Sequence, residues 1–178
     1  DAFCLAGGAV ALGLWVGFPD ATFTQVALFF AEALHFARLP RWKGWLARRS
    51  FLLVMLHVAY LFIPVGFLAL ALEAPSTGFH LLGIGAIGGM TSAVMMRATL
   101  GHSGRALEAG KTLSVIFCLL VSAALVRAFL PDIEAVGMSG LWLAASLCIA
   151  AYAGFIVQVG PWLIRPKQGQ KLVSKPGS

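Results

Sequence analysis

Six long apolar runs, separated by short polar connections, make up the hydrophobic pattern of this chain. Each run has about 17 to 25 residues, which at a helical rise of about 1.5 Å per residue is enough to cross a hydrocarbon core of about 30 Å. Apolar residues within a run are continuous instead of alternating with polar ones, which favours helices over barrel strands. The runs are Ala2–Phe18, Ala21–Leu39, Ser50–Leu72, Phe79–Leu100, Thr112–Leu130 and Gly140–Ile164. We therefore expect an all-α, polytopic transmembrane helix bundle of about six spans over residues 1–165, followed by a polar tail over residues 166–178.

Basic residues fall almost entirely in every second connection between these runs. They occupy residues 38–49, 97–111 and 165–175, and of the 13 lysines and arginines only Arg127 borders one of the other connections. Because positively charged loops stay in the cytoplasm, this distribution predicts that both termini and the basic tail are cytoplasmic. The span count and the charge pattern support each other, since a missed span would have broken the alternation.

The composition assigns the chain to the integral membrane proteins. Hydrophobic residues make up 60% and charged residues only 11%, whereas a soluble domain has about 25% charged residues. The net charge of +6 fits cytoplasmic loops at a lipid bilayer, and we expect no nucleic-acid partner. Three isolated cysteines lie in apolar runs without metal-binding spacing, and we interpret them as packing residues. The first residue is Asp1 instead of methionine, so we expect the chain to be part of a longer polypeptide.

All four histidines lie inside the apolar runs or at their edges, where ionisable side chains are rare and tend to mark a functional site or a polar network. His57 is the deepest, and Tyr60 and Pro64 follow it on the same helix face. This makes His57 the first candidate metal ligand, with Tyr60 as a residue that could orient a bound group. The structural alternative is that His57 hydrogen-bonds a backbone carbonyl of an adjacent helix.

His35 is a second candidate metal ligand. It follows Glu32 by three residues, a spacing that places both on one helix face and recurs, in two copies, at carboxylate metal sites. The structural alternative is a hydrogen bond from Glu32 to His35 or to a neighbouring helix. Depth along the helices makes His57 and His80 too distant to bind one iron and leaves His35 with His57 possible.

The segment from His80 to Arg105 combines a long apolar run with small residues. Gly85 and Gly89 are spaced by four and predict a strip where another helix backbone approaches closely. Met90 offers a thioether suitable for copper, although packing is the commoner role of a methionine in a transmembrane helix. We find no hydrolytic triad, phosphate loop or dinucleotide fingerprint, so no catalytic residue is assigned.

Two stretches carry a resemblance to a known family. They read RLPRWKGWLARRSFLLVMLHVAYLFIPVGF over residues 38–67 and HLLGIGAIGGMTSAVMMRATLGHSGR over residues 80–105. Both resemble the C-terminal half of the NnrS family of polytopic membrane proteins. Met96 and Ser103 depart from the family's pattern, because threonine is usual at both positions.

The resemblance implies a function. Members of the family contain haem and copper and are associated with bacterial denitrification and the response to nitric oxide. The resemblance therefore implies that this chain is a haem-binding protein of the bacterial inner membrane that acts in the response to nitrosative stress. It also implies copper as a second metal and nitric oxide as a ligand. The missing N-terminal half, or other membrane subunits, would be its partners. The candidate cofactor-binding residues are His57, His80, Tyr60 and Arg97, and the candidate metal ligands are His57, His80, His102, His35 and Met90.

A non-metal membrane module is the rival hypothesis. It would be half of a transporter, or an accessory subunit of a larger respiratory or photosynthetic complex. The histidines would then be hydrogen-bond partners within the membrane, and the glycine strip would contact another subunit. An absorption spectrum of the purified protein distinguishes the two hypotheses.

Overall fold

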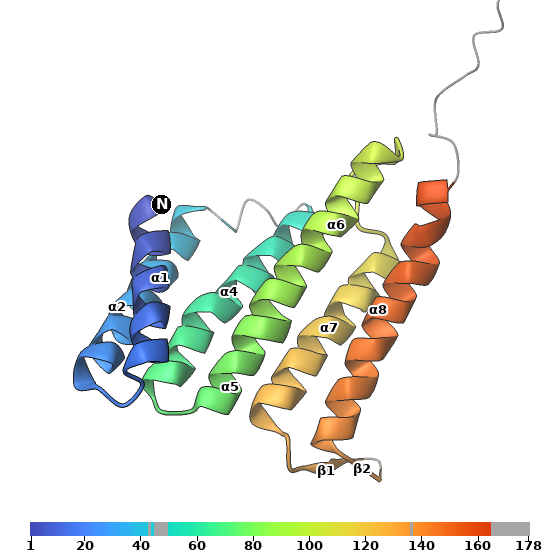
Figure 1. Ribbon diagram of the computed structural model, residues 1–178. Coiled ribbons are helices and arrows are strands. Elements are labelled where there is room, and N and C mark those ends of the chain that lie inside the picture. The colour runs from blue at the N-terminus through green and yellow to red at the C-terminus, as the bar shows by residue number, and fades with distance from the viewer. Residues whose placement is uncertain (43, 45–49, 136, 165–178) are drawn as a thin grey trace, which may run out of the picture.

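The fold is an all-helical bundle in which the helices stand side by side and alternate in direction (Figure 1). The computed structural model describes residues 1–42, 44, 50–135 and 137–164. Its elements are α1 (Ala2–Gly17), α2 (Thr22–Arg41), α4 (Phe51–Ala71), α5 (Pro75–His80), the π-helix η1 (Leu81–Gly88), α6 (Gly89–His102), α7 (Lys111–Phe129), β1 (Glu134–Ala135), β2 (Met138–Ser139) and α8 (Gly140–Ile164). The short antiparallel pair β1–β2 is the only extended structure in this part of the chain. The predicted helical fold class is confirmed.

Four helices are long and apolar enough to cross a bilayer: α4, the continuous helix α5–η1–α6, α7 and α8. Helix α1 is apolar but has only 16 residues, and α2 carries Glu32, His35 and Arg38 among its 20 residues. The count of six spans therefore stays a prediction. The polar tail over residues 166–178 lies outside the described residues.

Large apolar side chains cover the outside of the bundle. Phe3, Trp142 and Ile164 are 85%, 68% and 87% exposed. Apolar surface on this scale is unfavourable in water and is stable against lipid chains. The exposed faces and the long helices together identify a membrane protein.

Helix α4 lies at the centre of the packing, because it contacts α2, η1, α6 and α5. One buried cluster joins α4 to α6 and α7 through residues such as Met55, Met96 and Phe117. A second joins α4 to α1 and α2 through Phe67 and Leu28. Met96, which departs from the family pattern, is fully buried in the first cluster and therefore has a packing role.

The glycine strip contacts another helix, as predicted. A Cβ on Gly89 would stand 3.0 Å from the Cβ of Ala59 on α4. A Cβ on Gly85 would overlap the ring of Phe62 on the same helix. The backbones of α4 and the π-helical segment can approach this closely only because these positions lack side chains.

Both ends of the described chain lie at one end of the bundle, where α1 begins and α8 ends (Figure 1). The ends of α2 and α6 and the start of α7 lie there too. Arg38, Arg41, Arg105 and Lys111 therefore gather at this end, which we call the basic end. Arg127, near the end of α7, lies toward the opposite end.

Candidate functional site

His35 is buried between α1, α2 and α4, with only 3% of its surface exposed. Its Nδ1 lies 2.6 Å from the hydroxyl of Tyr60 on α4. Its ring stacks on Phe67 with the centroids 5.6 Å apart. These contacts fix the ring orientation, and they place Tyr60 beside His35 instead of beside His57, where the sequence suggested it would act.

Arg38 and His35 share the Tyr60 hydroxyl as a hydrogen-bond partner. The Arg38 guanidinium donates to the Tyr60 oxygen at 3.3 Å, which leaves the hydroxyl hydrogen available for Nδ1 of His35. We assign the hydroxyl as the donor to Nδ1, which places the hydrogen of a neutral His35 on Nε2. That nitrogen faces Gly8 of α1, where an added Cβ would stand 3.0 Å away.

His57 has the opposite arrangement. Its Nδ1 lies 2.7 Å from the carbonyl oxygen of Leu53, one turn earlier on α4. A carbonyl can only accept, so Nδ1 carries the hydrogen and Nε2 keeps a free lone pair. The Nε2 atom is buried and has no hydrogen-bond partner among the described residues. A buried lone pair with the ring held from its other nitrogen is the condition in which an imidazole binds a metal.

Trp42 lies against both Tyr60 and His57. Its ring centroid is 4.6 Å from that of Tyr60 and 5.9 Å from that of His57. Arg38 stacks on the same indole at 4.7 Å and forms a 3.0 Å ion pair with Asp1. Neither Trp42 nor Arg38 is among the site residues predicted from the sequence. The signal for Arg38 is its position three residues after His35, which places both on one face of α2.

His80 resembles His57 in its hydrogen bonding. Its Nδ1 lies 2.6 Å from the carbonyl oxygen of Ser76, which leaves Nε2 with the free lone pair. His80 is half-buried in α5, at the end of the bundle opposite the basic end, whereas His57 lies in the first half of α4. This separation agrees with the expectation that the two do not bind one iron.

The other predicted site residues are not brought together with His57. Arg97 and His102 are exposed and line a pocket of about 480 Å³ at the end of α6. Met90 is half-buried and shares with His35 a largely apolar cavity of about 330 Å³ between α1, α4 and η1. Glu32 is not a partner of His35, whose Nδ1 bonds to Tyr60. Within the described ranges, no three His, Cys, Asp or Glu side chains are close enough to hold a metal ion.

The comparison with protein families now gives the identity. The model of the family described as "NnrS protein" matches residues 1–167, which is nearly the whole chain. The chain belongs to the NnrS family. No curated protein and no solved structure matches the chain. The resemblance seen in the two sequence stretches is thereby confirmed.

Proposed function

We propose that this NnrS-family chain is a haem-binding integral membrane protein that acts in the response to nitric oxide, with copper as a second metal. The family membership and the membrane helices support the general assignment. The observation that carries the haem proposal is the buried Nε2 atom of His57, which has no hydrogen-bond partner in the part of the chain that the structure describes. A buried polar atom without a partner is costly, and a metal bond would remove that cost.

His57 would hold the haem iron through its Nε2. Its Nδ1–H is held by a backbone carbonyl, as is usual for a metal-bound histidine. His35 fits less well, since its assigned tautomer carries the hydrogen on Nε2. A haem iron with an open position binds nitric oxide. A second ligand, if the iron takes one, would come from a partner outside the described residues, because no other predicted ligand lies beside His57 there.

The copper part of the proposal concerns His80, His102 and Met90. His80 has an Nε2 that makes no bond to the Ser76 carbonyl, and Met90 has a thioether. The two residues do not share a cavity, because Met90 lines the apolar cavity beside His35 and His80 does not. We keep His80, His102 and Met90 as candidate copper ligands that require a partner from outside this chain. Thioether and imidazole are both suitable for copper.

The basic end of the bundle supports a cytoplasmic location for both termini. Five described cations lie at or toward this end, Arg97 of α6 included, and Arg127 lies toward the other end, which agrees with the positive-inside rule. We propose a six-span arrangement in a bacterial inner membrane. In this arrangement α1 is the shortest span, and α2 is the span that carries charged residues. A tag placed after Ser178 should be accessible only from the cytoplasm. Labelling of that tag from the periplasm would contradict the arrangement.

The non-metal module is retained as the second candidate function. The His35–Tyr60–Arg38 network favours it, because the Tyr60 hydroxyl pairs with both His35 and Arg38 without any cofactor. In that case His57 would find its partner in a subunit outside this chain.

An absorption spectrum of the purified full-length protein tests the two functions. The haem proposal predicts a Soret band that shifts when nitric oxide is added. A featureless visible spectrum, together with the absence of iron by elemental analysis, would contradict it and favour the non-metal module.

A further inference from the structure

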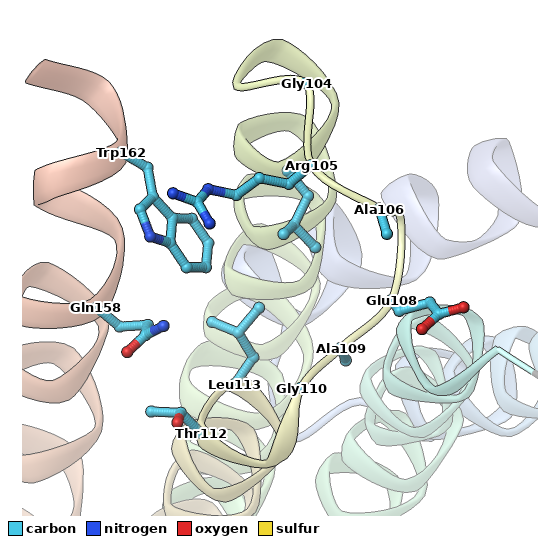
Figure 2. A pocket seen from close by; sticks show the side chains of 11 residues that line it. Gly104, Arg105, Ala106, Glu108, Ala109, Gly110, Thr112, Leu113, Gln158 and Trp162 are labelled. Carbon is cyan, nitrogen blue, oxygen red and sulfur yellow. The ribbon is translucent and has the colours of Figure 1, made fainter. Parts of the chain in front are cut away.

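A second polar site lies at the basic end, away from the histidines. A cavity of about 440 Å³ opens there between the loop that follows α6, the start of α7 and the end of α8 (Figure 2). Arg105 comes from the loop, Thr112 from α7, and Gln158 and Trp162 from α8. Segments distant in the sequence thus place several hydrogen-bond donors around one space.

Two charged side chains line this cavity, Arg105 and Glu108, and no ion pair of Arg105 is found within the described part of the chain. The central carbon of the Arg105 guanidinium lies 4.5 Å from the centroid of the Trp162 ring. Its Nε is buried and has no hydrogen-bond partner among the described residues. Figure 2 shows the guanidinium directed toward Trp162, whereas the carboxylate of Glu108 points the other way. A buried N–H without an acceptor is costly, and an anion beside the half-buried Arg105 would remove that cost.

The start of α7 adds further donors to the same space. Gly110 precedes the helix without any side-chain cap. The first helical bond runs from the Ser114 amide to the Gly110 carbonyl, so the amides of Lys111, Thr112 and Leu113 have no helical acceptor. Gly110, Thr112 and Leu113 line the cavity. Free amides and the positive end of the helix dipole both favour an anion at this place.

We propose that this cavity binds a phosphate group, carried by the headgroup of an anionic phospholipid. Arg105 would bind two phosphate oxygens with its planar fork, and the start of α7 would supply amide donors. Leu100, Leu113 and Trp162 provide apolar walls for the glycerol portion of a lipid. The basic end is where headgroup phosphates of the cytoplasmic leaflet meet the bundle. Free phosphate shares the same chemistry and is the other source of the ligand.

Lipid binding by the purified full-length protein tests the proposal. Native mass spectrometry of protein equilibrated with phosphatidylglycerol or phosphatidylcholine should show preferential retention of phosphatidylglycerol. Arg105→Gln should lower that preference about tenfold or more, because a charge-assisted hydrogen bond is lost. Arg41→Gln, which removes an exposed cation at the same end of the bundle, should retain it. An unchanged preference in Arg105→Gln, or equal losses in both variants, would overturn the proposal.

Two further measurements keep the test decisive. If Arg105→Gln does not fold, Arg105→Lys keeps the positive charge but lacks the planar guanidinium. We expect the preference of this variant for phosphatidylglycerol to fall several-fold, and an unchanged preference would refute the role of the guanidinium.

Inorganic phosphate at millimolar concentration separates the two sources of the phosphate group. Thermal stabilisation of the wild type by free phosphate as well as by phosphatidylglycerol would support phosphate chemistry without a lipid requirement, and stabilisation by the lipid alone would support the headgroup. Stabilisation by neither would overturn the proposal.

Discussion

His35 and His57 each have a hydrogen bond at Nδ1, but the partners of that nitrogen differ. His35 accepts from Tyr60, so its outer nitrogen carries a hydrogen, whereas His57 donates to the Leu53 carbonyl, so its outer nitrogen keeps a lone pair. The first ring is stabilised by neighbouring side chains, and the second has a buried Nε2 without a partner among the residues that the structure describes. The difference teaches that burial alone does not show which nitrogen of a histidine is available to a ligand, because that depends on the partner of the other ring nitrogen.

The largest effect is expected from filling the space beside His35. Leucine at Gly8 would place its Cβ 3.0 Å from Nε2 of His35 and 3.3 Å from the Phe67 ring. Overpacking of a buried contact and displacement of His35 should together destabilise the protein by about 3 kcal/mol. Gly13→Leu is the matched control, since nothing lies within 4 Å of a Cβ there. Thermal unfolding in detergent measures both, and equal stability of the two variants would contradict the packing of α1 on His35.

Removal of the Tyr60 hydroxyl should have the next largest effect and should separate the two histidines. Tyr60→Phe leaves Nδ1 of His35 and a guanidinium donor of Arg38 unpaired, at a cost of about 2 kcal/mol. The haem spectrum should not change, because no contact joins Tyr60 to His57 except through Trp42 among the described residues. Tyr152→Phe is the control, as it alters the other tyrosine of the chain. A spectral change in Tyr60→Phe alone would mean that Tyr60 serves the metal after all.

The smallest effect is expected at Trp42, whose ring contacts both Tyr60 and His57. Trp42→Leu removes the ring contacts to Tyr60 and His57 and the stacking of Arg38, worth about 1 kcal/mol in total. We expect a modest loss of thermal stability and a small shift of the Soret band. A Soret band with the same position and intensity as in the wild type would show that the indole does not border the bound group.

The sequence predicted the helices well because each apolar run is long and continuous. The run Ala2–Phe18 became α1 (Ala2–Gly17), and the run Gly140–Ile164 became α8 with the same bounds. The contact of Gly89 with Ala59 was also predictable, since a spacing of four places small residues on one helix face. These features depend on residues close together in the chain.

The pairing of polar side chains could not be predicted in the same way. Tyr60 shares a helix face with His57, and the sequence therefore assigned it there, but the packing of α2 against α4 presents it to His35, 25 residues earlier. The free amides and the orphaned Arg105 nitrogen likewise depend on how α6, α7 and α8 meet. The π-helical segment Leu81–Gly88 was not predicted either, because its wider turn arises in a run whose pattern is ordinary for an α-helix.

The central claim is that His57, and not His35, binds the metal, and a pair of alanine variants tests it most directly. Haem content and the Soret band should be measured for His57→Ala and His35→Ala in the full-length protein, after both are shown to insert into the membrane. We predict that His57→Ala loses or strongly shifts the band, while His35→Ala keeps it with reduced thermal stability. An intact band and unchanged iron content in His57→Ala, with loss of both in His35→Ala, would contradict the account.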